Sequence, residues 1–367
     1  MPHFPSRPLS TTSTPPTQNF TYRLAAASSA KRHPPRAAKP QTDFWTYSST
    51  TRKPSPPYLR STKIDSGEDA FFATTIASSP HDVAFGVADG VGGWQDQGVD
   101  PSDFSHGLCG LMAGTAHIHE VDGRGPVRPQ WLLQTAYDAV MANPRIMAGG
   151  STATVATLDG EGEMETANLG DSGYLIFGPG KVAYRSAVQT HAFNTPFQMS
   201  KVPPKMQAQH AIFGGSTHFS ETPAQADVVR HKVRHGDVVV VATDGVWDNL
   251  SAQDTLSIVT RVMQEGGYWS TGDKETLLNN TSISSIDVEE HEKYLPALVA
   301  TAIMREAKMA GLDRKRNGPF AKEVNYHYPA EGWSGGKPDD IAVVVCVAVD
   351  GGVGKQEEEQ PPVRAKL

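Results

Sequence analysis

Cysteine is scarce in this sequence of 367 residues, with only Cys109 and Cys346 present. Two cysteines cannot build a disulfide framework or a complete zinc ligand set, and both lie among apolar residues, which favours small core positions. Long apolar runs are also absent: the strongest, 238–242, has the length of a buried strand and is far too short to cross a membrane. The sequence therefore predicts a protein without disulfides, structural zinc or a membrane span.

Acidic residues are missing from the first 42 positions. The whole chain has a formal charge of −7, of which this segment contributes +6, so the remaining residues carry −13. Such an acidic body repels nucleic acid, and we therefore expect no nucleic-acid partner. It would also repel a phosphorylated substrate unless metal ions were recruited. The basic residues of the segment are Arg7, Arg23, Lys31, Arg32, Arg36 and Lys39.

Residues 1–60 are rich in Ser, Thr, Pro and Ala and show little periodicity, so we expect them to be disordered. An Arg-bearing, Ser-rich and acid-free start is typical of a mitochondrial transit peptide, although the early prolines disfavour a presequence helix. An ordinary disordered tail is the alternative. A secretory signal is not expected, because no apolar core segment is present. Residues 351–367, rich in Gly and Glu, are expected to form a second disordered tail.

The middle of the chain, residues 61–350, has the pattern of a folded domain. Helical spacing of apolar residues predicts helices over 129–143 and 295–310, and Ser251 with Asp254 forms a capping box that predicts another. Strands and helices in mixed order, with several short strands in succession, predict an α/β (α+β) layered domain with antiparallel sheets. The strand-like runs are 71–76, 83–88, 152–158, 174–177, 238–243 and 341–347.

Aspartates stand at the ends of three of these predicted strands. If the third strand runs antiparallel to the other two, their carboxylates meet at one sheet edge, where they would repel one another unless cations neutralise them. Hard oxygen ligands select Mg²⁺ or Mn²⁺. A single Asp-Gly after a strand is more often a hairpin turn, so this pattern alone leaves turns and a metal centre both open. The residues are Asp89-Gly90, Asp244-Gly245 and Asp339-Asp340.

Six motifs over roughly residues 64–349 resemble, in order and spacing, those of the metal-dependent type 2C protein serine/threonine phosphatase family. They are Gly67-Glu68-Asp69-Ala70, Val87-Ala88-Asp89-Gly90-Val91-Gly92-Gly93-Trp94, Gly150-Ser151-Thr152-Ala153, Asn168-Leu169-Gly170-Asp171-Ser172-Gly173, Thr243-Asp244-Gly245-Val246-Trp247-Asp248 and Asp339-Asp340-Ile341. The resemblance implies two central antiparallel sheets flanked by helices in an α-β-β-α sandwich. It also implies hydrolysis of phosphoserine and phosphothreonine in proteins by a water that bridges two metal ions.

The resemblance assigns roles to individual residues. Asp89 would bridge two Mg²⁺ or Mn²⁺ ions, the Gly90 carbonyl would complete one site, and Asp244 and Asp339 would bind the other ion. Glu68 and Asp69 would hold metal-bound waters. Asp171 and Asp248, together with Asp244, would form a weaker third metal site. Asp340 stands where many members have Asn, and we expect it to form hydrogen bonds only.

Residues 67–72, 87–101, 193–198 and 335–340 resemble the mitochondrial branch of the family. This likeness implies a matrix location and phosphorylated matrix proteins as substrates, ubiquinone-synthesis factors among them. The basic, acid-free start of the chain agrees with that location.

Two positions depart from the family pattern. Val91 stands where many members have a histidine that is a proposed general acid. Ile64 stands where many members have a phosphate-binding arginine, which leaves Lys63 as the nearest cation; the alternative for Lys63 is an ordinary surface lysine. We expect His191 to be structural. The alternative to an enzyme is a pseudophosphatase that acts as a binding or scaffold module, although no metal aspartate is missing. A nucleotide-binding loop is excluded because the Gly-Lys-Ser/Thr ending is absent.

Overall fold

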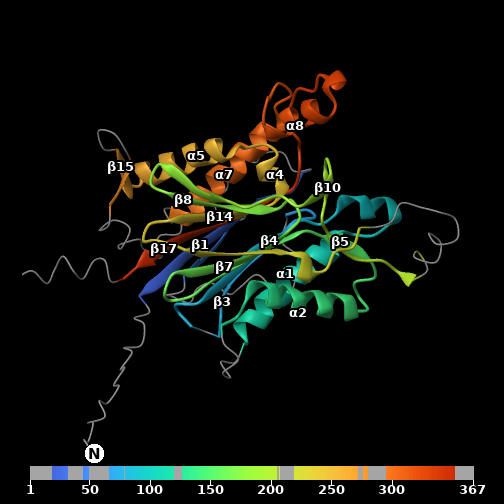
Figure 1. Ribbon diagram of the computed structural model, residues 1–367, viewed down its shortest axis with the longest axis horizontal. Helices are drawn as coiled ribbons and strands as arrows, with labels where there is room; N and C mark the ends of the chain where they lie inside the picture. The colour runs from blue at the N-terminus through green and yellow to red at the C-terminus, as the bar shows by residue number, and fades with distance from the viewer. Residues whose placement is uncertain are drawn as a thin grey trace, which may run out of the picture.

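The computed structural model describes residues 19–31, 44–48, 66–77, 79–119, 126–204, 206, 219–271, 276–279 and 295–351. Two antiparallel sheets form its centre (Figure 1). One has six strands in the order β2 (Phe44–Ser48), β1 (Phe20–Ser29), β17 (Ile341–Asp350), β14 (Val238–Ala242), β8 (Gly173–Gly178) and β9 (Lys181–Arg185). The other has five, in the order β13 (Asp227–Lys232), β7 (Glu163–Leu169), β6 (Ala153–Leu158), β4 (Val83–Ala88) and β3 (Ala70–Thr75).

Helices cover the outer face of each sheet, which completes four layers (Figure 1). Helices α1 (Ser102–His117) and α2 (Pro129–Ala142) pack on the five-stranded sheet. Helices α5 (Ala252–Glu265) and α7 (Leu295–Leu312) pack on the six-stranded sheet. The predicted α-β-β-α sandwich is therefore confirmed, as are the predicted helices at α2, α5 and α7 and the Ser251–Asp254 capping box.

The shorter elements lie around this sandwich. They are α4 (Asp244–Trp247), α8 (Pro319–His327), the 3-10 helices η2 (Gly92–Gln97), η3 (Pro223–Gln225) and η4 (Pro329–Glu331), and the strand pairs β10 (Thr190–Ala192) with β11 (Thr195–Pro196), β5 (Gly149–Ser151) with β12 (Met199–Lys201), and β15 (Trp269–Thr271) with β16 (Thr276–Leu278). Among the helices that the structure describes, none combines the length and apolarity that a bilayer crossing requires.

Strand β17 shows why the central runs are apolar without interruption. Val343 and Val345 face the helices of the six-stranded sheet, whereas Val344 and Cys346 face the second sheet. Successive side chains of a strand point to opposite faces, so a strand that is covered on both faces needs apolar residues at every position. Cys346 and Cys109 are both buried and free, as the sequence predicts.

The expectation that residues 1–60 are disordered is wrong for residues 20–29. Strand β1 lies inside the six-stranded sheet between β2 and β17, and it pairs with β17 from Phe20↔Asp350 to Ser29↔Ile341. Its small side chains, three of them consecutive alanines, have weak strand propensity, and it is the two neighbouring strands that stabilise it. The folded domain therefore begins near residue 19, not residue 61. Residues 1–18, where a transit peptide would begin, and residues 352–367 lie outside the described residues.

Candidate active site

Acidic residues from both sheets meet at one end of the sandwich. Asp89 follows β4 in the five-stranded sheet, whereas Asp244 follows β14 and Asp339 precedes β17 in the six-stranded sheet. The sequence pattern predicted that all three strands share one sheet edge. This is right for β14 and β17, which pair antiparallel, and wrong for β4, which belongs to the other sheet. The stacking of the two sheets brings the aspartates together. One carboxylate oxygen each from Asp89, Asp171 and Asp244 lies within 4.8 Å of the others.

Backbone hydrogen bonds hold Asp89 in place. Its carbonyl oxygen accepts from the Thr152 N–H at 3.0 Å and from the Ser151 hydroxyl at 2.8 Å. The Gly90 N–H donates to the Glu68 carbonyl at 3.2 Å, and a Cβ at Gly90 would lie only 2.6 Å from that oxygen. Glycine at this position is therefore required by the close approach of the segment that carries Glu68.

The first acidic motif lies against the end of β17. Asp69 is buried, and its Oδ2 accepts from the Thr243 hydroxyl at 2.7 Å. Asp340 accepts from the backbone N–H of Glu68 at 2.8 Å. The Asp340 carboxylate thus fixes the backbone of the motif at Glu68, and the Thr243 hydroxyl holds the Asp69 side chain. A Cβ at Gly245 would lie 2.0 Å from the Asp340 carbonyl, so the second Asp-Gly glycine is also required by close packing.

Burial and mutual repulsion raise the pKa values of Asp89 and Asp171. Burial raises the pKa of Asp89 well above its usual range, and the charges of Asp244 and Asp69 raise it further. Burial, with the charges of Asp244 and Asp248, raises the pKa of Asp171 to about 8. A bound cation would reverse these shifts, because it favours the ionised carboxylates.

The residues of the cluster fit a divalent metal centre. Oδ1 of Asp171 is buried and has no hydrogen-bond partner in the part of the chain that the structure describes. A buried acceptor without a partner is costly, and a cation would satisfy it. The donors are oxygens alone, which suits Mg²⁺ or Mn²⁺.

Asp89, Asp171, Asp244 and Asp339 line a cavity of about 440 Å³. Two lysines with no role predicted from the sequence line it as well. Lys337 Nζ lies 2.5 Å from Asp244 and 2.7 Å from Asp248. Lys31 Nζ lies 3.5 Å from Asp339. Lys337 could have been suspected from its place two residues before Asp339, whereas Lys31 lies in a segment expected to be disordered. Lys63, the predicted phosphate ligand, lies outside the described residues.

His191 has partners of its own outside the acidic cluster. Its Nε2 lies 3.0 Å from Glu221 Oε1, and its ring stacks on Phe197 and Phe219. It is not among the residues that line the acidic cavity, whereas Val91 is. This environment agrees with the structural role that the sequence analysis expected for His191.

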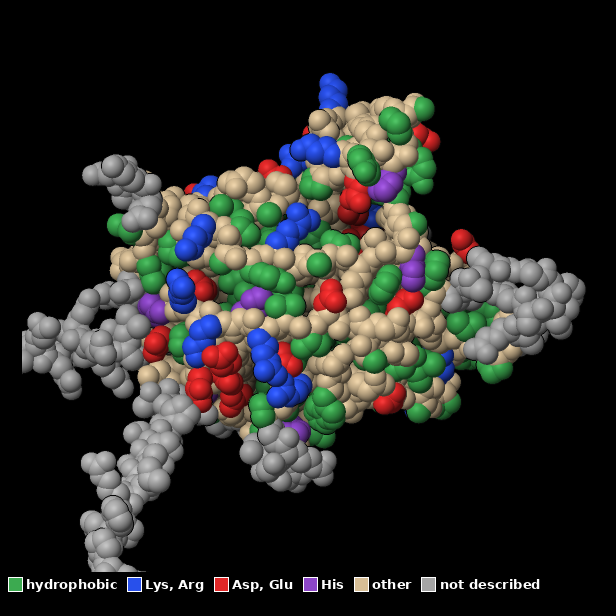
Figure 2. Space-filling view, viewed as in Figure 1, with side chains coloured by type: hydrophobic (Ala, Val, Ile, Leu, Met, Phe, Trp, Pro, Cys, Tyr) green, Lys and Arg blue, Asp and Glu red, His purple; other side chains and the backbone are tan. Residues whose placement is uncertain are grey.

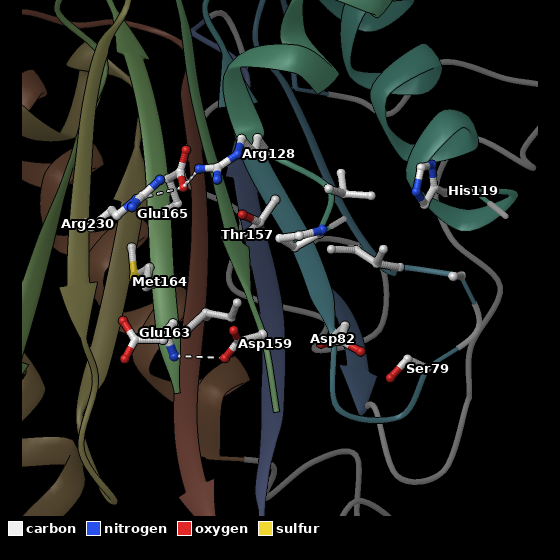
Figure 3. Close-up of a pocket in the computed structure, with 15 residues that line it drawn as sticks. Ser79, Asp82, His119, Arg128, Thr157, Asp159, Glu163, Met164, Glu165 and Arg230 are labelled. Atoms are coloured by element: carbon white, nitrogen blue, oxygen red, sulfur yellow. Dashed lines mark hydrogen bonds and ion pairs between the residues drawn. The ribbon is translucent and has the colours of Figure 1, made fainter. Parts of the chain in front are cut away.

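A second cavity, of about 540 Å³, lies beside β7 and α2 (Figure 3). There Arg128 and Arg230 approach Glu165 from two sides, at 2.8 and 3.0 Å. Lys232 pairs with Glu163 on the same strands, and Figure 2 shows acidic and basic side chains interleaved over β7 and β13. Glu163 and Glu165 are thus paired with basic side chains, whereas the Asp82 and Asp159 carboxylates, which also line the cavity, accept from backbone N–H groups.

Comparison with known proteins identifies the family. A fruit-fly protein named protein phosphatase PTC7 homolog fig (Drosophila melanogaster) is 31% identical over 316 residues, which cover 85% of this chain and 87% of the relative. A zebrafish PTC7 homolog (Danio rerio) is 35% identical over 286 residues, 77% of this chain and 82% of the relative. The chain belongs to the type 2C protein phosphatase family. It is a metal-dependent protein serine/threonine phosphatase.

Two further comparisons agree with this family. The yeast relative, protein phosphatase 2C homolog 7, mitochondrial (Saccharomyces cerevisiae), is 32% identical over 292 residues and covers 79% of the phosphatase and 76% of its own chain. The X-ray structure of the photosystem II phosphatase PBCP superposes with a TM-score of 0.56 at 25% identity, covering 77% of the phosphatase and 91% of that chain. No family model matches the sequence.

Proposed function

We propose that the phosphatase hydrolyses phosphoserine and phosphothreonine with two Mg²⁺ or Mn²⁺ ions held by Asp89, the Gly90 carbonyl, Asp244 and Asp339. The observation that carries this proposal is the convergence of Asp89, Asp171 and Asp244 from two sheets, with a buried Asp171 oxygen that has no partner in the described part of the chain. When bound, the metal ions would lower the pKa of a water and neutralise charge on the phosphoryl oxygens.

The protein itself supplies position and charge. Glu68 and Asp69 would orient water through hydrogen bonds, and the packing of Asp340 on the Glu68 backbone supports both. Water attacks phosphorus, a new P–O bond forms, and the bond to the serine or threonine oxygen breaks. That oxygen then takes a proton, which the Val91 side chain cannot supply. Solvent water is the proposed donor, because His191 pairs with Glu221 instead.

The proposed substrates are phosphorylated proteins of the mitochondrial matrix, ubiquinone-synthesis factors among them. Two observations support this location: the residues before β1 include Arg7 and several serines and threonines but no acid, and the yeast relative is mitochondrial by name.

The test of the reaction is turnover of phosphoserine and phosphothreonine peptides by the full chain. We expect phosphate release in Mn²⁺, none in excess EDTA, and recovery when Mn²⁺ is restored, because the carboxylate cluster needs a cation before it can accept a phosphate. A chain that binds Mn²⁺ and phosphopeptide but releases no phosphate would instead support the pseudophosphatase alternative.

Lys31 is the proposed ligand of the substrate phosphate, in place of Lys63. Its side chain is 54% exposed, and its single described ion pair, 3.5 Å to Asp339, is of the solvent-exposed kind that contributes about 0–1 kcal/mol. The backbone at Lys31 is nevertheless fixed. Its N–H donates to Asp340, and buried Lys308 donates to the carbonyls of Ala30 and Lys31 at 2.7 and 3.2 Å. Lys31 therefore presents an available cation from a rigid position.

We expect Lys31→Met to raise KM for a phosphopeptide by about tenfold, equivalent to about 1.4 kcal/mol of lost binding. The kcat should fall much less, because the metal ligands remain. Lys31→Arg should restore KM, since it returns a cation that can bind phosphate. Steady-state kinetics with the exposed Lys181→Met as control checks this; an unchanged KM in Lys31→Met would refute the role.

A further inference from the structure

The Lys337 ammonium group lies at the centre of three carboxylates. Its Nζ lies 2.5 Å from Asp244, 2.7 Å from Asp248 and 3.3 Å from Asp339, and its side chain is only 18% exposed. A lysine ammonium has three hydrogen-bond donors, so these three carboxylates match its full donor capacity. Among the described residues that line the cavity, Lys31 is the other cation, and it is far more exposed.

The backbone of Lys337 is held as firmly as its side chain. The Asn249 side chain accepts from the Lys337 N–H at 3.0 Å and donates to the Lys337 carbonyl at 2.8 Å. Asn249 is buried beneath α4 and donates to the Gly245 carbonyl as well. The preceding Gly336 packs against α7, where a Cβ would lie 2.1 Å from the Ala310 carbonyl. The position of the ammonium group is therefore built into the fold.

An aromatic ring closes the other side of the lysine. Phe320, in α8, places its ring centroid 5.6 Å from Lys337 Nζ, within the range of a cation–π contact. The Phe320 N–H donates to the Asp248 carbonyl at 2.9 Å, which fastens α8 to the acidic cluster. The Lys337 side chain is largely withdrawn from water, and this strengthens the attraction of its ammonium group to the carboxylates.

These contacts disagree with the third metal site that the family resemblance implies. That site would use Asp171, Asp244 and Asp248, and Lys337 already pairs with two of the three. A metal ion between Asp244 and Asp248 would meet the positive charge of the ammonium group and compete for the same oxygens. Asp89 and Asp171 make no ion pair in the described part of the chain. Asp244 places one oxygen within 4.8 Å of an oxygen of each, so it still faces the two-metal centre while it pairs with Lys337.

We infer that Lys337 is a resident cation that takes the place of a third metal ion. The centre then holds two divalent ions and one fixed ammonium group that neutralises Asp248 and part of Asp244. This inference rests on the proposed two-metal centre. Lys337 then has a positioning role, because its ion pairs hold Asp244 and Asp339, two proposed metal ligands, even without bound metal.

The number of Mn²⁺ ions bound by the full chain at saturation tests the inference, by calorimetric titration and by metal analysis after equilibrium dialysis. We expect two ions for the wild type and for Lys337→Arg, which keeps the charge. Lys337→Met should bind a third, weaker ion, because Asp244 and Asp248 lose their cation. The double variant Lys337→Met/Asp248→Asn should again bind two ions, because the third site loses a carboxylate. Lys315→Met, a change at an exposed lysine, is the control and should bind two ions like the wild type.

Three ions in the wild type would overturn the inference, even if Lys337→Met proved too unstable to study. A count of two in a folded Lys337→Met would overturn it as well. A wild type that binds no Mn²⁺ would instead contradict the proposed metal centre itself, so the two failures are distinguishable.

Discussion

Asp89→Asn should abolish most phosphatase activity while leaving the fold intact. The replacement turns the proposed bridging ligand into a neutral amide at the point where the two sheets meet. We expect kcat on a phosphopeptide to fall by more than about 100-fold at moderate Mn²⁺. Even the loss of a residue that only hydrogen-bonds to a metal ligand commonly lowers activity or metal affinity by about 10–100-fold. Asp227→Asn, an exposed change on β13, is the matched control and should keep full activity.

The same variant should be at least as stable as the wild type when metal is removed. Burial and neighbouring carboxylates raise the pKa of Asp89 in the folded protein. The folded protein therefore loses stability relative to the unfolded chain as the pH rises from the unfolded-state pKa of Asp89 through its folded-state pKa. Asparagine does not ionise, so the variant avoids this loss. Thermal unfolding in EDTA at pH 7 should give an equal or higher Tm. Near-normal turnover in Asp89→Asn, or a clearly lower Tm in EDTA, would contradict the assignment of Asp89.

A chain that begins at Ser61 should fail to fold, although the sequence alone suggests that it keeps the whole domain. It lacks β1, whose Tyr22 and Leu24 are fully buried between the two sheets. Burial of one large side chain contributes about 1.5–3 kcal/mol. The loss of two such residues, and of the pairing along the whole of β17, is comparable to the total stability of about 5–15 kcal/mol of a typical domain.

A chain that begins at Asn19 is the matched control and should keep the fold and the activity. Circular dichroism, gel filtration and phosphopeptide turnover compare the two. In cells, the chain from Asn19 should also lose mitochondrial import, because the start of the proposed transit peptide is gone. A soluble, active chain from Ser61 would show that β1 is dispensable. Mitochondrial accumulation of the chain from Asn19 would place the targeting signal elsewhere.

The sequence by itself determined most of the fold and predicted the aspartates of the proposed metal centre. Asp89 and Asp244 each follow an apolar run and precede glycine, and Asp339 stands just before another such run. These signals are local, because strand propensity and turn chemistry depend on a few neighbouring residues. The apolar runs also predicted layered antiparallel sheets, since strands covered on both faces require apolar residues at every position.

Only the tertiary structure decided the role of the N-terminal segment and of the two lysines. Residues 25–29 of strand β1 have weak strand propensity of their own, and β17, more than 300 residues later in the chain, stabilises them by pairing. That pairing carries Lys31 to the acidic site. Lys337 reaches Asp244 and Asp248 because Asn249 fixes its backbone. Contacts between residues so distant in the chain leave no periodic pattern in the sequence, and they arise only when the two sheets and the helices pack together.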